Sequence, residues 1–187
     1  MEVIVLDNEV DESIIRSWDS FVNSHPQGNI FQTFNYFNLF RDLKGFHPVA
    51  VLLIDDTSNV EAVLSGIIQY QIKGPFRSYA SRCIVMGGPL FQNNKLSLLK
   101  KILEAFDNFI KNKAIYTQVR ILSELQYAKS VFNDLQYNFE DHLNIKVDLT
   151  STKEVLWSEV QPQKRNQINK AIRLGLEMRI ISSADDL

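Results

Sequence analysis

The chain has 187 residues, 45% of them hydrophobic, and a formal net charge of −2 at pH 7. This composition is typical of one folded domain and excludes an intrinsically disordered chain. A protein whose main role is to coat nucleic acid would be more basic. The single cysteine, Cys83, excludes an internal disulfide and a multi-cysteine zinc site, and the three histidines lack metal-ligand spacing. We therefore predict no metal site.

The sequence gives no signal for a membrane or a secretory route. Its longest apolar run, residues 49–54, has six residues, whereas a membrane-spanning helix needs roughly 18. The N-terminus is acidic and lacks the basic start and the small-residue cleavage site of a signal peptide. We predict a cytoplasmic protein without a membrane span.

In the first half of the chain, apolar periodicity and turn residues predict strands that alternate with helices. A strand at 3–6 precedes a helix that Asp11 and Glu12 open and that the residues 25–29 end. Thr33 caps a second helix, which Gly45 stops. Three more strands follow, the first two joined by a turn at 55–59: residues 48–54, 60–72 and 83–86.

The second half continues with a long helix capped by Asn93 or Asn94. Its predicted inner face comprises Leu96, Leu99, Ile102, Leu103, Phe106 and Ile110. A strand at 114–122 and a helix from the capping box of Ser123 and Gln126 to about Leu135 come next. The remaining predicted elements are a strand at 143–149, a helix capped by Thr152 and interrupted at 161–162, a helix at 163–174 that Gly175 stops, and a strand at 176–181.

This order predicts an α/β domain with a central mixed sheet flanked by helices. We expect residues 1–181 to form that single domain. Residues 182–187, a Ser pair followed by acidic residues, have the pattern of a helix start, so we expect them to begin a second domain. The alternative is a frayed polar tail.

The element order is the one used by GNAT-type N-acyltransferases, and four motifs narrow the resemblance. They are Gly28-Asn29-Ile30-Phe31-Gln32-Thr33, Met86-Gly87-Gly88-Pro89-Leu90, Val147-Asp148-Leu149, and Lys164-Arg165-x-x-Ile168-x-Lys170-Ala171-x-x-x-Gly175. Together they resemble the Fem family of peptidoglycan-bridge aminoacyltransferases and their FemAB-like relatives. The resemblance covers nearly the whole chain, but only the first GNAT-like half of such a protein.

The resemblance implies two GNAT-like domains in tandem, which move an amino acid from aminoacyl-tRNA onto the lysine-type amine of a cell-wall precursor. Some relatives transfer ordinary acyl groups instead. The donor, aminoacyl-tRNA or acyl-CoA, would then bind the second domain, and tRNA would be a partner only through that domain. We expect no cofactor in this chain.

Lys164 and Arg165 are the first candidates for binding an acceptor. They lie in the first turn of the predicted helix 163–174, where positive charge opposes the helix dipole and is better tolerated beside a bound anion. The family resemblance points the same way, because its acceptors carry a diphosphate. The alternative is a solvated pair of charges, or an Arg165 that pairs with a local carboxylate.

Gln32, Asn35, Tyr36 and Arg41 are further candidates, in and after the segment that opens the second helix. The family often has Gln-Ser/Thr-x-x-Trp here, close to the peptidyl acceptor, and Tyr36 replaces the usual Trp. Some members place a phosphate-contacting Lys about one and a half turns into this helix. In this chain that contact is either shifted, with Arg41 nearby, or absent.

The CoA-binding pattern of GNAT proteins is Q/R-x-x-G-x-G/A, whose backbone N–H groups cradle a pyrophosphate. Arg82 is followed three positions later by Val85, so this spacing fails. Pro89 also removes one N–H donor from the Gly-Gly turn. We therefore expect no acetyl-CoA site, and we interpret Cys83 as a buried structural thiol.

The leading hypothesis is the acceptor-binding half of a FemAB-like aminoacyl or N-acyl transferase, which takes a small-molecule or peptidyl amine, phosphorylated or not. Such a reaction can run on positioning, a deprotonated amine and backbone oxyanion donors, and no catalytic side chain is identified. Two alternatives stay open. One is a stand-alone CoA-dependent N-acetyltransferase, and the other is a non-catalytic GNAT-like binding module.

Overall fold

A computed structural model describes residues 1–6, 11–72, 74, 77–145 and 147–177. The chain divides into two compact units, Met1–Asp141 and His142–Leu187. The predicted domain boundary at residue 181 lies outside the described residues.

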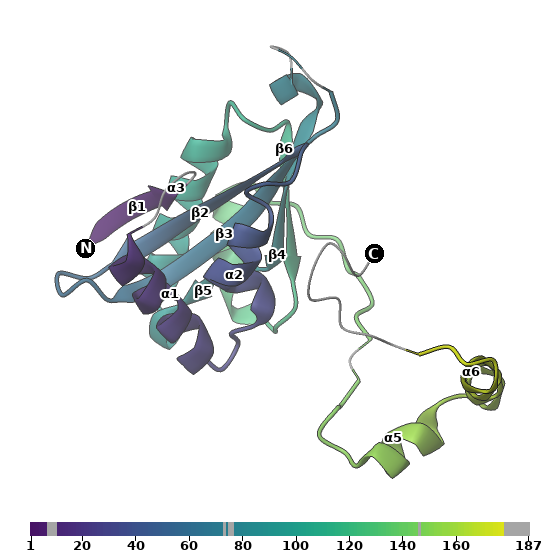
Figure 1. The fold of residues 1–187 in the computed structure, drawn as a ribbon. Coiled ribbons are helices and arrows are strands. Elements are labelled where there is room, and N and C mark those ends of the chain that lie inside the picture. Colours follow the sequence, from purple (N-terminus) through teal and green to yellow (C-terminus); the bar gives the residue numbers. More distant parts are fainter. Residues whose placement is uncertain (7–10, 73, 75–76, 146, 178–187) are drawn as a thin grey trace. The chain divides into compact units, whose positions relative to one another are not determined.

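The first unit is built on a mixed sheet (Figure 1). Its strands are β1 (Glu2–Leu6), β2 (Phe46–Ile54), β3 (Val60–Tyr70), β4 (Ser81–Gly87), β5 (Leu90–Phe91) and β6 (Tyr116–Ile121). The order is β1-β2-β3-β4-β6, and the short β5 pairs with β3. All pairs are antiparallel except β4 with β6, which are parallel because a helix connects them.

Helices cover both faces of this sheet (Figure 1). They are α1 (Glu12–Ser24), α2 (Phe34–Leu39), α3 (Leu96–Ile110) and α4 (Lys129–Asp134). The apolar side of α1 and α2 packs around Trp18 and Phe37 on one face, and α3 and α4 pack around Phe106 and Phe132 on the other. Because β2 is buried from both sides, its residues 49–54 form a continuous apolar run instead of an alternating one.

The two predicted helix caps of the first half are confirmed. The Asp11 carboxylate accepts from the Ser13 backbone N–H at 2.8 Å, and the Thr33 hydroxyl accepts from the Tyr36 N–H at 3.3 Å. The second helix is shorter than predicted, since α2 ends at Leu39 and not at Gly45. The reason is that β2 begins at Phe46, so the intervening residues turn the chain back toward the sheet.

The starts of α3 and α4 are corrections to the prediction. Asn93 and Asn94 cap nothing, because both have left-handed backbone angles in a short 3₁₀ turn before α3. Leu96 is consequently 37% exposed, and Leu98 (4% exposed) begins the buried face. Ser123 does not form the predicted capping box, because residues 126–128 form a separate 3₁₀ turn and α4 begins only at Lys129.

The second unit contains α5 (Lys153–Glu159) and α6 (Pro162–Arg173). The predicted cap at Thr152 is confirmed, and Gly175, with φ +76°, follows the end of α6 as predicted. The apolar sequence pattern of the helix capped by Thr152 predicts a core position for Trp157, but its side chain is 38% exposed within the described residues. The predicted strand 176–181 and the segment 182–187 lie almost wholly outside the described residues.

The predicted strand at 143–149 is wrong for the residues that the structure describes, which form neither helix nor strand there. The alternating apolar side chains are all exposed: Leu143, Ile145, Val147 and Leu149. A strand exists only through hydrogen bonds to a neighbour, and the described structure records no strand pairing for this segment.

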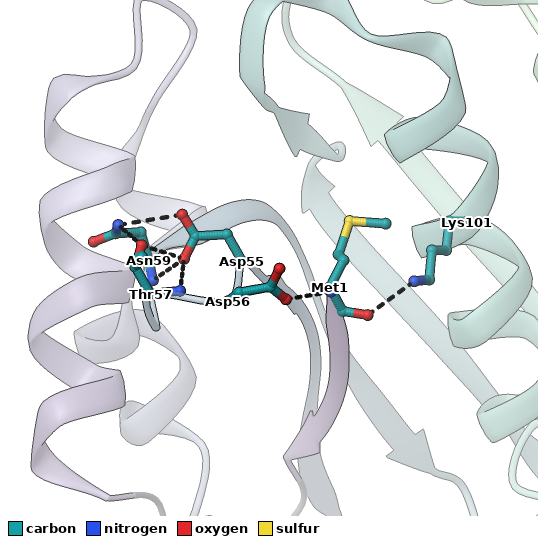
Figure 2. Close-up of polar contacts among 6 residues, drawn as sticks. All are labelled: Met1, Asp55, Asp56, Thr57, Asn59 and Lys101. Carbon is teal, nitrogen blue, oxygen red and sulfur yellow. Dashed lines mark hydrogen bonds and ion pairs between the residues drawn. The ribbon is translucent and has the colours of Figure 1, made fainter.

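The turn between β2 and β3 is held by one carboxylate (Figure 2). Asp55 accepts from the backbone N–H groups of Thr57 and Asn59, both at 2.8 Å, as expected for an Asx turn. These hydrogen bonds lower the pKa of Asp55 to about 2. Beside it, Asp56 pairs with the Met1 amine at 2.9 Å, an exposed contact of little energetic weight. Lys101 of α3 donates to the Met1 carbonyl at 3.4 Å.

Candidate functional site

Gln32 joins two of the sequence motifs. It lies at the end of a 3₁₀ turn (Ile30–Gln32) and is 1% exposed. Its side-chain Nε2 donates to the carbonyl oxygens of Gly87 and Gly88, at 3.2 and 2.9 Å. Its Oε1 accepts from the Asn29 N–H at 3.0 Å. The polar atoms of Gln32 are thus used inside the protein, and a direct contact between Gln32 and an acceptor stays a prediction.

The Gly87 position tolerates no side chain. Its φ is +85°, and a Cβ atom there would lie 2.8 Å from the Asn29 Oδ1. Gly87 is also the last residue of β4, so the contact fixes the segment before α2 against the end of the central sheet. This arrangement explains why Gly28–Thr33 and the Gly-Gly-Pro turn carry recognisable sequence patterns.

The face of β4 and β6 that lies on the side of α2 carries polar residues. Val119 and Ile121 of β6 pack against the α3 side of the sheet, so Gln118 and Arg120 point to the opposite side. The parallel register places Arg120 beside Met86 of β4. The Arg120 guanidinium contacts the Met86 Sδ at 3.9 Å and the Gln118 Oε1 at 3.3 Å.

Tyr36 of α2 adjoins this polar face. Its ring packs edge-on against Phe31 and Phe40, each with a ring-centroid distance of 5.2 Å. Burial raises the pKa of the Tyr36 phenol, and the nearby positive charge of Arg120 offsets part of that rise. The predicted candidate Tyr36 therefore lies close to a residue that the sequence analysis did not select.

A second arginine, Arg82, lies on the same face at the start of β4, and the buried Ile84 separates it from Met86. The alternation that buries Cys83 and Val85 toward α3 turns Arg82 to the side of Gln118 and Arg120. Its Nε donates to the Gln69 Oε1 of β3 at 3.0 Å. We call the polar surface formed by Gln69, Arg82, Met86, Gln118 and Arg120 the β4–β6 shelf.

Sequence reasoning missed the shelf because Gln118 and Arg120 of β6 lie more than thirty positions after Met86 of β4. The only available signal is that polar residues alternate with apolar ones at 118–121, which is typical of a strand with one uncovered face. That pattern does not say which strand is the neighbour, and the pairing of β6 with β4 is what brings Arg120 to Met86.

The other predicted site residues are spread over the molecule. Asn35 is exposed on α2, and Arg41 is exposed and donates to the Asn38 side chain at 3.4 Å. Lys164 and Arg165 are in the first turn of α6 as predicted, with Lys164 exposed and Arg165 half-buried. They belong to the second unit, so their grouping with the α2 candidates stays a prediction.

The turn that precedes α3 differs from a CoA-binding turn. Since α3 begins at Leu96, the segment to compare with Q/R-x-x-G-x-G/A is Gln92-Asn93-Asn94-Lys95-Leu96-Ser97. Lys95 and Ser97 stand at the two positions where that pattern has small residues without obstructing side chains. The Gly-Gly-Pro turn lies earlier, is held by Gln32, and leads into β5 instead of directly into the helix.

Other parts of the described chain offer no catalytic constellation. Cys83 is fully buried, as predicted, and burial raises the pKa of its thiol to about 12, so it is not a nucleophile near neutral pH. Within the described residues, no three His, Cys, Asp or Glu side chains gather as metal ligands. A hollow of about 510 Å³ lies at the β1 edge, lined by Glu2, Ser13 and Asp55 among others, and it contains none of the predicted site residues.

None of the described helices combines the length and the apolar character that a membrane crossing requires.

No model of a known protein family matches the chain, and neither does any curated protein. Solved structures do match it. The aminoglycoside N-acetyltransferase AAC(6')-Iy, in complex with CoA, is 9% identical with a TM-score of 0.52 over 79% of this chain and 98% of that one. AAC(6')-IG from Acinetobacter haemolyticus is 10% identical with a TM-score of 0.51, over 79% of this chain and 100% of that one.

These likenesses show that the chain has the GNAT-type acyltransferase fold, in agreement with the predicted fold class. At such low identity they show the fold alone. The GNAT part of the sequence resemblance is therefore confirmed, while its FemAB-like and cell-wall parts belong to the proposal that follows.

Proposed function

We propose that the chain is a GNAT-type N-acyltransferase module that presents the amine of an acceptor on the β4–β6 shelf. The observation that carries the proposal is the part of this shelf formed by Met86, Gln118 and Arg120, which lies toward the carboxyl ends of the parallel strands β4 and β6 and within electrostatic reach of Tyr36. In open α/β sheets ligands bind at the carboxyl ends of such strands.

In its finer form, the proposal is that the chain is the acceptor-binding half of a FemAB-like aminoacyl or acyl transferase. The four ordered motifs support it, and two of them meet in space through Gln32 and the carbonyls of Gly87 and Gly88. We favour a donor site on another domain, following residues 1–181, over one on this module. The Gly-Gly-Pro turn is occupied by the Gln32 side chain, and Lys95 and Ser97 stand where the CoA-binding pattern has small residues.

The proposed chemistry is the attack of a neutral primary amine on an activated acyl group. A bond forms between the amine nitrogen and the carbonyl carbon, the bond from that carbon to the donor oxygen or sulfur breaks, and a proton from the amine goes to the departing atom. The module contributes by orienting the amine, which can supply a large share of the rate enhancement without a catalytic side chain.

A second candidate is a stand-alone CoA-dependent N-acetyltransferase. It is favoured by the structural neighbours, because AAC(6')-Iy is named as an N-acetyltransferase in complex with CoA. This candidate needs a pyrophosphate site at the start of α3, where Lys95 and Ser97 replace the small residues of the usual pattern.

Two measurements on the full-length protein distinguish the candidates. Isothermal titration calorimetry with acetyl-CoA tests the donor site, and mass spectrometry of a lysine-containing peptide tests transfer from bulk aminoacyl-tRNA. We expect no acetyl-CoA binding at the start of α3 and an increase in peptide mass by one aminoacyl or acyl group. Saturable acetyl-CoA binding that shifts the NMR signals of residues 92–97, together with acetylation of the peptide, would refute the acceptor-half proposal in favour of the second candidate.

A further inference from the structure

We propose that Arg120 binds a carboxylate of the acceptor, so that the substrate class is an amine that also carries a carboxylate. This inference rests on the proposed function, since it concerns the same β4–β6 shelf. It is carried by two observations, the lack of a carboxylate partner for Arg120 among the described residues and the neutral groups that contact its guanidinium. It is supported by the electrostatic effect of Arg120 on the Tyr36 phenol.

Arg120 forms no ion pair with a carboxylate among the described residues. Its two hydrogen-bonding contacts are neutral, a thioether sulfur at 3.9 Å and an amide oxygen at 3.3 Å. A guanidinium has five N–H donors in a planar fork, so several of them have no acceptor among the described residues. By contrast, the exposed Arg16 of α1 is paired with Glu12 at 3.4 Å.

The Arg120 side chain is exposed, and two neighbouring side chains contact its guanidinium. Gln118 lies two residues earlier on the same strand face, and Met86 lies opposite in the parallel register. Both are half-buried, so a planar partner that binds the fork would be shielded from solvent on the Met86 side. Charge-assisted hydrogen bonds strengthen under such partial shielding.

Tyr36 supplies a second donor. Its ring is fixed between Phe31 and Phe40, and no hydrogen bond of its hydroxyl group to another described residue is recorded. Arg120 acts electrostatically on the Tyr36 phenol, so a ligand that spans the two groups can accept hydrogen bonds from both. A guanidinium fork with one adjacent neutral donor matches a carboxylate.

The charge at this point favours a carboxylate over a phosphate dianion. The other cation of the shelf, Arg82, pairs in register with Tyr116, four positions before Arg120 on β6. At about 3.3 Å per residue, the two arginines are roughly 13 Å apart along the strands. One positive charge therefore faces the ligand at Arg120, which balances the single negative charge of a carboxylate.

The test uses two matched pairs of amines, titrated into the full-length protein without any donor. Nα-acetyl-L-lysine and Nα-acetyl-L-lysinamide differ only in the carboxylate, and O-phosphoethanolamine and ethanolamine differ only in the phosphate. Binding is followed by NMR through the Nε–H signal of Arg120. We expect Nα-acetyl-L-lysine to bind about tenfold or more tightly than its amide, the effect of one charged hydrogen-bonded contact.

In the variant Arg120→Gln, this preference should disappear, whereas Arg16→Gln should retain it in full. Equal affinity for the two lysine compounds, a preference that survives Arg120→Gln, or a larger preference within the phosphate pair would overturn the inference. If Arg120→Gln fails to fold, the Nε–H signal of Arg120 in the unchanged protein is the test. A signal that does not shift when Nα-acetyl-L-lysine is added would then overturn the inference. Because no donor is present, a failure of acyl transfer would refute the proposed function and leave this result unaffected.

Discussion

At the residue scale, Gln32 is the polar side chain on which the arrangement of the candidate site depends. Replacing it by Leu leaves the carbonyls of Gly87 and Gly88 and the Asn29 N–H without their partner in a buried place. We expect Gln32→Leu to lower the free energy of unfolding by about 2–4 kcal/mol, as buried unsatisfied groups cost about 1–3 kcal/mol each. Urea denaturation measures it. Gln163→Leu, at an exposed position of α6, is the control and should change stability by less than about 0.5 kcal/mol.

Also at the residue scale, Asp55 gives the turn between β2 and β3 a dependence on pH. Its pKa in the folded protein is about 2, below the ordinary value of 3.8, chiefly because of the hydrogen bond from the Asn59 N–H. Because the pKa is lowered, the ionised Asp55 carboxylate stabilises the fold at pH values above 3.8. This contribution is lost as the pH falls through 3.8 toward 2. We expect the Tm of Asp55→Asn to lie below that of the unchanged protein at pH 6, and the difference to shrink steadily as the pH falls from 3.8 to 2. A difference that stays constant over this range would show that ionisation of Asp55 plays no part.

At the element scale, α3 tests the corrected start of a helix. Leu98 is 4% exposed and Leu96 is 37% exposed, although the sequence pattern assigns Leu96 to the buried face. We expect Leu98→Ala to cost about 2–5 kcal/mol of unfolding free energy and Leu96→Ala less than about 1 kcal/mol. Chemical denaturation of the two variants measures the costs. Equal costs would contradict the observed register of the helix.

The same elements show what the sequence can predict and why the rest escapes it. Long apolar periods identify β2, β3 and α3, because burial on one or both faces imposes their pattern. Helix starts are less predictable, because Asn93 and Asn94 are equally suited to a cap and to the left-handed turn that they form here. The candidate site was half predicted. Tyr36 lies in a recognisable motif, whereas Arg120 joins it only through the pairing of β6 with β4.

At the scale of the whole molecule, the chain consists of two units, of which the first ends at Asp141. Proteolysis of the residues that follow Asp141 tests this division. Residues 143–145 and 147–149 form no helix or strand, and Leu143 and Ile145 are 90% and 85% exposed. Exposed backbone without regular hydrogen bonds is a preferred site of proteolysis. We expect thermolysin, which cleaves before large apolar residues, to cut first between residues 142 and 150 and to release a stable fragment that contains the first unit.

The mass of the first fragment, measured over a time course, decides the matter. Equally apolar positions of β3, such as Leu64 and Ile68, are fully buried and should be cleaved only on global unfolding. A first cut inside residues 1–141 would contradict the division into units. Protection of residues 142–150 would mean that this segment forms a strand of a sheet in solution. The period-two pattern of its apolar residues predicts such a strand, whereas the described structure does not contain it.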